Sequence, residues 1–255
     1  MSICSALLAA LAVATVSAGS AAILPLGDSI TLGCGSTGMP AGDNGCAAEA
    51  VGYRVPMMLA LSQALTGTNS TVHTVGTLSN GPPSLAATGW LRHDGHPGFR
   101  IDQLDNTNGQ SLYFDRWVAQ RPDIITLHLG TNDCYQNYQP ATLLTKMDTL
   151  LNHTFQALPR THVFLASILA TPDLGRCATD FNAMIPPLVR AHAARGHNIT
   201  YVPVAELSGL CAPDASAERG LCASKNVHPI AAGYLRVVAS AFAFALLQSY
   251  DFGQD

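Results

Sequence analysis

Short apolar runs alternate along the chain with longer segments in which apolar residues recur every three or four positions. Runs that end at glycine or polar residues are typical of buried strands, and the three-to-four spacing is typical of helices that pack on a sheet. The runs predict five strands, at residues 23–26, 72–76, 123–129, 162–168 and 199–204. The remaining segments predict helices near residues 55–65, 110–120, 143–155, 181–189 and 229–247.

This alternation predicts an α/β fold with a five-stranded parallel sheet that helices cover on both faces. Right-handed crossovers then bring the ends of the first, third and fifth strands to one edge of the sheet. Pro186-Pro187 interrupts the fourth helical pattern, so we expect that helix to be distorted or to restart there. Residues 77–109 read as a long loop, which in a compact domain usually serves a function.

The composition supports one domain with a large core. The chain has 255 residues, of which 48% are hydrophobic and 12% are charged. The net charge is −4 and no Lys/Arg cluster occurs, which argues against nucleic acid or an anionic membrane surface as a partner. We find no repeat and no second domain, and we expect residues 19–255 to form a single domain and a monomer.

Residues 1–18 have the character of a secretory signal. They are rich in alanine, leucine and valine and end in Val16-Ser17-Ala18, a small-residue site that favours cleavage after Ala18. A membrane anchor is the alternative, and the shortness of the apolar run argues against it. We therefore expect a secreted, extracellular protein. Three glycosylation sequons suit that location, at Asn69, Asn152 and Asn198.

Six cysteines remain once the signal is removed, and an even number in a secreted chain suggests disulfides. Several pairings are possible, and the expected topology favours Cys34–Cys46, Cys211–Cys222 and Cys134–Cys177. The chain contains no Cys-x-x-Cys or His-x-x-x-His cluster, so we expect no zinc site.

Polar residues follow the ends of three of the predicted strands. Ser29 comes directly after the first strand, Asn132 after the third, and His228 after the fifth. A serine that attacks an ester needs a base for its proton and donors for the developing oxyanion. His228 could be the base, and the Ser29 amide, the Gly98 amide and the Asn132 side chain could be the donors. Each residue alone has an ordinary structural explanation. Their expected position together at one edge of the sheet, however, favours a hydrolase.

At these positions the chain resembles the SGNH (GDSL-type) hydrolases. Four segments match the family's blocks in order: Gly27-Asp28-Ser29, His96-Pro97-Gly98-Phe99 through its glycine, Gly130-Thr131-Asn132-Asp133 and Val227-His228-Pro229. The resemblance runs from about Ile23 to the C-terminal helix. Within the superfamily the chain is most similar to the secreted esterases of carbohydrate esterase family three, which includes acetylxylan esterases. The opening Leu-Pro-Leu-Gly-Asp-Ser-Ile-Thr and the block Gly-His-Pro-Gly-Phe-Arg-Ile-Asp carry that closer similarity.

The resemblance implies a three-layer α/β/α, flavodoxin-like fold. It implies Ser29 as the nucleophile, His228 as the base, and Ser29, Gly98 and Asn132 as the oxyanion hole, with no metal or organic cofactor. We therefore expect a secreted serine esterase that removes acetyl or other short acyl groups from plant polysaccharide such as acetylated xylan, or from small esters. Five residues are candidates for a sugar-facing loop: Trp90, His93, Asp94, His96 and Arg100.

One position departs from the family pattern. The family usually has aspartate three residues before the histidine, where this chain has Lys225. That carboxylate normally fixes the imidazole tautomer, and a lysine cannot accept the hydrogen bond. We expect a Ser29–His228 dyad with a substitute acceptor, which could be a backbone carbonyl near Ser224, Asp214 or Glu218.

Two other functions stay open. Lys225 favours a catalytically weak or inactive SGNH fold that binds carbohydrate or acts as a secreted effector. A lipid esterase is the third possibility, and the lack of an obvious apolar lid segment argues against it.

Overall fold

The computed structural model describes residues 19–37, 46–105, 112–207 and 227–253. The expected signal peptide, the Cys211–Cys222 pair and Lys225 lie outside the described residues, as do Asp214 and Glu218.

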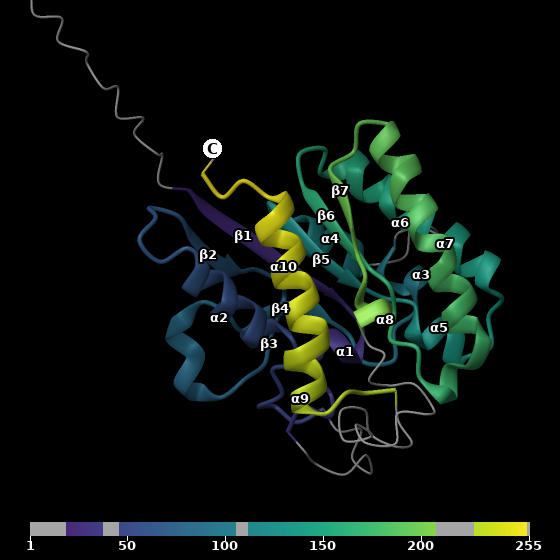
Figure 1. Cartoon of the computed structure of the whole chain (residues 1–255), viewed down its shortest axis with the longest axis horizontal. Coiled ribbons are helices and arrows are strands. Elements are labelled where there is room, and N and C mark those ends of the chain that lie inside the picture. The colour runs from purple at the N-terminus through teal and green to yellow at the C-terminus, as the bar shows by residue number, and fades with distance from the viewer. Residues whose placement is uncertain (1–18, 38–45, 106–111, 208–226, 254–255) are drawn as a thin grey trace, which may run out of the picture.

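A central sheet crosses the molecule between two layers of helices (Figure 1). In the described part of the chain its strands are β1 (Ser20–Gly27), β2 (Thr71–Thr74), β3 (Leu78–Ser79), β4 (Arg92–Gly95), β5 (Ile124–His128), β6 (His162–Ala166) and β7 (Ile199–Val202). The principal strands pair in parallel in the order β2-β1-β5-β6-β7. This is the flavodoxin-like order, with the direction of winding reversing between β1 and β5. The predicted α/β class, three layers and parallel sheet are confirmed.

Strand β4 was not predicted. It lies within the segment that reads as a loop, because its sequence Arg-His-Asp-Gly has no apolar alternation. Its buried side chains are polar and are paired instead: His93 Nε2 lies 3.2 Å from Asn80 Oδ1, and Asp94 accepts the Thr77 amide at 2.9 Å. The two-residue strand β3 runs antiparallel to β4. Hydrogen bonding between polar groups therefore replaces the apolar pattern from which strands are predicted.

Strands β2 and β4 share one edge of β1. β2 pairs with β1 as far as Ile23, and β4 pairs with it from Leu26 onward. The carbonyls of Ile23 and Gly27 both point to this edge. Since the backbone groups of successive residues point to opposite edges of a strand, those of residue 25 point to this edge as well. Pro25, which has no N–H to donate, thus falls in the gap between the two partners. A proline is accommodated in a central strand for this reason.

Helices cover both faces of the sheet (Figure 1). One face carries α2 (Arg54–Ala64) and a C-terminal helical segment. That segment consists of α9 (Ala231–Gly233), the π-helical turn η5 (Tyr234–Ala239) and α10 (Ser240–Ser249). The other face carries α3 (Ile101–Leu104), α4 (Leu112–Val118), α6 (Pro140–Ala157) and α7 (Gly175–Ala194). Short turns complete the fold: α1 (Ser29–Leu32), α5 (Thr131–Tyr135), α8 (Val204–Leu207), and the 3-10 turns η2 (Pro83–Thr88) and η3 (Pro172–Leu174).

The fourth helix was expected to be distorted or to restart at Pro186-Pro187. It does not restart, because α7 runs as one helix through both prolines. The buried residues Phe181 and Ile185 precede the prolines, and Val189 follows them. Packing of this stripe against the core on both sides of the two prolines compensates for the missing amide donors.

The buried face of α2 includes a charged residue. Arg54 and Met57 are completely buried, whereas Leu59 is 47% exposed. The Arg54 guanidinium donates five hydrogen bonds, all to backbone carbonyls, at 2.9 to 3.2 Å: Thr31, Leu32, Ala50, Asn80 and Leu91. It thereby joins the end of α1 to the loop before α2 and to the β3–β4 edge.

Two of the three expected disulfides are confirmed. Cys34–Cys46 closes the loop after α1, and Cys134–Cys177 joins α5 to α7. The third pair lies outside the described residues.

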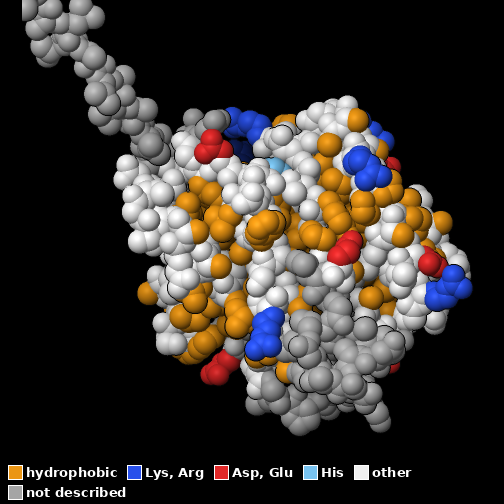
Figure 2. All heavy atoms as spheres, in the orientation of Figure 1, with side chains coloured by type: hydrophobic (Ala, Val, Ile, Leu, Met, Phe, Trp, Pro, Cys, Tyr) orange, Lys and Arg blue, Asp and Glu red, His pale blue; other side chains and the backbone are white. Residues whose placement is uncertain are grey.

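The helical segment Ala231–Ser249 is long and apolar enough, by length and composition, to cross a membrane. However, 56% of its most apolar window is buried inside the structure, where α10 packs on α2, β6 and β7. Figure 2 shows hydrophobic side chains over the face that carries α2 and α10, and few charged ones. Leu59, Phe244 and Leu247 are the large exposed hydrophobic residues of these two helices.

The hydrogen bonds of Arg54 lead to a prediction about the stability of the fold. Replacing Arg54 with methionine keeps the apolar stem but leaves buried carbonyls without donors, and each unsatisfied group costs about 1–3 kcal/mol. We expect Arg54→Met to lower the free energy of unfolding, measured in urea, by about 3 kcal/mol or more. The exposed Arg116→Met on α4 is the control and should change it by less than about 0.5 kcal/mol. Equal stability of the two variants would contradict the role given to Arg54.

Candidate active site

Ser29 lies at the carboxyl end of β1, at the edge where the sheet reverses its direction of winding. Asp28 caps α1 by accepting the Ile30 amide at 2.9 Å, so Ser29 is the first residue of that helix. A Cβ atom at Gly27 would lie 2.2 Å from the carbonyl oxygen of His128. Glycine is therefore required here because β1 and β5 approach closely just before the serine.

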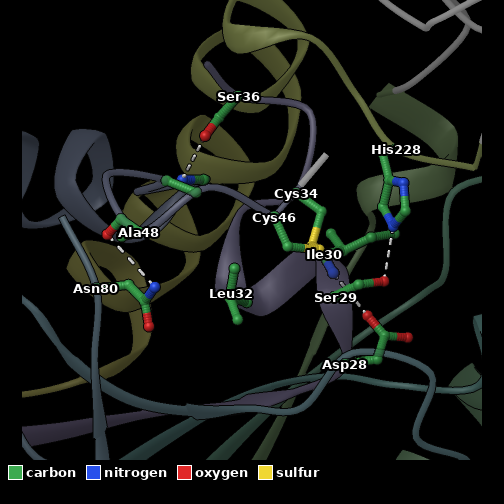
Figure 3. The surroundings of a disulfide bond; sticks show 12 residues. Asp28, Ser29, Ile30, Leu32, Cys34, Ser36, Cys46, Ala48, Asn80 and His228 are labelled. Carbon is green, nitrogen blue, oxygen red and sulfur yellow. Dashed lines mark hydrogen bonds between the residues drawn. A yellow bond between two sulfur atoms is a disulfide. The ribbon is translucent and has the colours of Figure 1, made fainter. Parts of the chain in front are cut away.

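His228 meets Ser29 across 199 positions of the sequence. Its Nε2 lies 2.8 Å from Ser29 Oγ, and Figure 3 shows the imidazole directed at the hydroxyl. The imidazole is half-buried, and burial lowers its pKa below the ordinary histidine value. The ring is therefore neutral near pH 7, which is the form that can accept a proton from the serine.

The backbone at Gly35 lies against His228. A Cβ atom on Gly35 would lie 3.2 Å from His228 Cβ and 2.8 Å from the Pro229 carbonyl oxygen, and φ is +84°. The neighbouring Cys34 is held by its disulfide and by the Tyr234 hydroxyl, which donates to the Cys34 carbonyl at 2.8 Å. The segment on which His228 packs is thus fixed by two contacts, of which Figure 3 shows the disulfide.

Gly98 and Asn132 follow the two strands that flank β1. The turn after β4 is attached to β1 by the His96 amide, which donates to the Gly27 carbonyl at 3.0 Å. Asn132 is on α5, directly after β5, and its Nδ2 donates to the Phe99 carbonyl at 2.9 Å. Gly98 has φ of +80°, a left-handed conformation that favours glycine, and a Cβ there would meet nothing within 4 Å. The structure thus places the Gly98 turn and Asn132 on opposite sides of the β1 end.

This arrangement places a hydroxyl, an imidazole and several hydrogen-bond donors at one edge of the sheet. As the first residue of a helix, Ser29 has an amide with no carbonyl partner inside that helix. One of the two Asn132 Nδ2 hydrogens is donated to Phe99, which leaves the second for another acceptor. The groups are those that acyl transfer through a serine requires. Among the described residues, no group of three or more His, Cys, Asp or Glu side chains could hold a metal ion.

The five candidates for a sugar-facing loop make contacts within the protein. Trp90 precedes β4 and packs on the cluster beneath α2, at the opposite end of that strand from Gly98. His96 is buried and stacks on Phe99 with ring centroids 4.7 Å apart. Arg100 pairs with Asp102 and also donates to Gln136. The fold provides structural contacts for all three side chains; His93 and Asp94 are buried in β4.

Sequence reasoning missed Lys146. This residue is on α6, and its Nζ lies 3.0 Å from Asp133 Oδ1 and 2.8 Å from Asp102 Oδ1. Its position was a usable signal, because Lys146 stands between the buried Leu143 and Met147 on the apolar stripe of the helix. A charged residue on such a stripe indicates a buried partner.

Comparisons with known proteins agree with this fold. The model of the GDSL-like Lipase/Acylhydrolase family matches residues 26–236. A family 3 carbohydrate esterase from Clostridium thermocellum is 25% identical, with 90% of this chain and 96% of that chain covered and a TM-score of 0.66.

Two further solved structures share the fold. A carbohydrate esterase family 3 structure from Talaromyces cellulolyticus is 22% identical, with 89% and 97% coverage and a TM-score of 0.68. An acetyl esterase variant with acetate ion has the same identity and coverage and a TM-score of 0.67. No curated protein matches the chain.

The burial of His228 leads to a prediction about its pKa. Because burial disfavours the imidazolium, the His228 resonances in an NMR titration should report a pKa below about 6.5. The variant His228→Asn, which lacks those resonances, assigns them. A pKa at or above the ordinary value would show that burial does not dominate, and would indicate a carboxylate rather than a backbone carbonyl at the second ring nitrogen.

Burial also raises the pKa of Asp28, to about 7, and Asp133 adds a smaller repulsion. The folded state therefore holds a proton that the unfolded chain loses near pH 4, and the stability this gives is lost as the pH rises through about 7. We expect the free energy of unfolding of the wild type to fall relative to that of Asp28→Asn between pH 4 and pH 8. Asparagine keeps the cap on Ile30 but does not titrate. A difference that is constant or rises with pH would contradict this assignment.

Proposed function

The chain belongs to the GDSL-like lipase/acylhydrolase family, and from this membership we propose that it is a secreted serine esterase that removes acetyl and other short acyl groups from plant polysaccharide such as acetylated xylan. The observation that carries the proposal is the 2.8 Å contact between His228 Nε2 and Ser29 Oγ. The solved structures named above support the carbohydrate ester as substrate, since two are family 3 carbohydrate esterases and one is an acetyl esterase.

In the proposed reaction Ser29 Oγ attacks the acyl carbon and its proton passes to His228 Nε2. The carbonyl oxygen becomes an oxyanion that accepts hydrogen bonds from the amides of Ser29 and Gly98 and from Asn132 Nδ2. His228 then gives its proton to the oxygen of the leaving sugar, and an acyl-enzyme remains. Water attacks this ester while His228 takes a proton, and the same proton returns to Ser29 as the free acid leaves.

The imidazole needs a partner for its second nitrogen, because that hydrogen bond holds the ring in the tautomer that presents a free Nε2. Lys225 cannot accept it. We propose that a substitute acceptor, a backbone carbonyl near Ser224 or the carboxylate of Asp214 or Glu218, takes the place of the family's aspartate. All of these lie outside the described residues.

The proposal includes secretion, with residues 1–18 as a cleaved signal, residues 19–255 as the mature single domain and Cys211–Cys222 as a third disulfide. Of the sequons, Asn69 and Asn198 are exposed in the turns before β2 and β7. Asn152 is inside α6, where the Thr154 hydroxyl is buried and donates to Leu150. We therefore propose glycans at Asn69 and Asn198.

The test compares the wild type with Ser29→Ala and His228→Ala on acetylated xylan and on 4-nitrophenyl acetate. Each variant should lower kcat by about a thousandfold or more, and the double variant should be no slower than the single ones, because the two residues act as a unit. Ser79→Ala, an exposed serine on β3, is the matched control and should retain full activity.

Equal acetate release by the wild type and Ser29→Ala would exclude the esterase and favour a carbohydrate-binding or effector protein. A series of 4-nitrophenyl esters distinguishes the substrate classes: kcat/KM should fall as the acyl chain lengthens beyond a few carbons. A rise with chain length would indicate a lipid esterase instead.

A further inference from the structure

Three side-chain hydrogen bonds join residues 132–136, in α5 and at its end, to residues 99–101, which directly follow Gly98. Asn132 Nδ2 donates to the Phe99 carbonyl at 2.9 Å, the Ile101 amide donates to Asp133 Oδ2 at 3.0 Å, and Arg100 Nη1 donates to Gln136 Oε1 at 3.0 Å. These bonds fix the distance between the two segments that supply the proposed oxyanion donors. Of the three, the bond to Asp133 has an ionisable acceptor.

Asp133 is a completely buried carboxylate. A buried charge is retained only where it is paired, since otherwise the group takes up a proton and becomes neutral. Burial does raise the pKa of Asp133, and the ammonium of Lys146, 3.0 Å from its other oxygen, acts against that shift. One oxygen of Asp133 therefore contacts the Gly98 turn, while the second contacts α6.

Lys146 is itself held in place. Its Nζ also contacts Asp102 Oδ1 at 2.8 Å, and it lies 3.9 Å from the centre of the Tyr138 ring. Lys146 is one of only two lysines in the chain, which otherwise uses arginine for its positive charges. A compact ammonium with three donors suits a site between two carboxylates and a ring face, where the planar guanidinium of arginine has a different geometry.

We propose that Lys146 is a positioning residue for the oxyanion hole: it holds the Asp133 carboxylate on the Ile101 amide and so fixes the Gly98 turn relative to Asn132. The inference rests on the proposed esterase function and deepens it. Lys146 does not touch the reacting atoms. It acts through Asp133 and the turn.

This role has a kinetic signature. Oxyanion donors stabilise charge that develops in the transition state, so a displaced donor lowers kcat and leaves ground-state binding nearly unchanged. A shift of about 1 Å in such a group can cost about a hundredfold in rate. A merely structural role for Lys146 would instead lower the melting temperature without changing kcat for the folded protein.

The first variant is Lys146→Met, assayed on 4-nitrophenyl acetate beside the wild type and Ser29→Ala. We expect kcat to fall by about tenfold to a hundredfold with KM changed less than about twofold, in protein shown to be folded by circular dichroism. Arg195→Met is the matched control. It removes an ion pair with Asp148, also on α6, and should leave kcat unchanged.

The decisive test is whether a second substitution restores the kcat that Lys146→Met loses. Asparagine at position 133 has no charge to compensate, and its side-chain oxygen can still accept the Ile101 amide. The double variant Lys146→Met/Asp133→Asn should therefore regain most of the kcat lost by Lys146→Met and should come within about threefold of Asp133→Asn alone. Should Lys146→Met not fold, Asp133→Ala gives the parallel comparison: it removes the acceptor, keeps the Lys146–Asp102 pair, and should lower kcat with KM unchanged.

An unchanged kcat in Lys146→Met would overturn the inference, as would a double variant as slow as Lys146→Met. In both cases a large difference between the wild type and Ser29→Ala would leave the proposed function intact. If the wild type and Ser29→Ala are equally inactive, the esterase function fails and the inference fails with it.

Discussion

The close approach of β1 and β5 at Gly27 is the constraint on which the rest of the structure depends. No side chain fits there, because a Cβ atom would lie 2.2 Å from the His128 carbonyl. β1 therefore ends in a turn at this point, and Asp28 starts a new helix with Ser29 as its first residue. The hydroxyl comes to lie at the edge of a sheet whose strand order reverses there, and His228 reaches it from the far end of the chain.

Around that hydroxyl the fold uses polar groups as structural elements. The Arg54 guanidinium satisfies five backbone carbonyls, from the end of α1, the loop before α2 and the segment between β3 and β4, and the buried pair of Asp133 with Lys146 joins two more segments. Loops cannot bury backbone groups without partners, so a site built from loops needs side chains that supply them. Only 12% of the residues are charged, yet several of these are buried close to the site, where they hold its loops in position.

The sequence pattern predicted the strands and helices that form by burying apolar side chains. β1 and β5 are clear because they are short, almost continuous apolar runs, and α6 is clear because its buried residues are apolar with a helical period. Strand β4 was missed since its buried residues are polar, and the continuity of α7 was missed because packing overrides the prolines. The motif residues Ser29, Asn132 and His228 were found from their position after strands. Lys146 was not, because no motif marks it and its role follows only from its contacts with Asp133 and Asp102 in the folded chain.

In the proposed reaction His228 activates Ser29 as a nucleophile. The most direct measurement is the mass of the peptide that contains Ser29 after the protein reacts with a sulfonyl fluoride, which modifies activated serines. We expect one adduct per chain, on Ser29, formed by the wild type and lost in His228→Asn. An adduct that forms equally fast in His228→Asn, or a wild type that forms none, would contradict it.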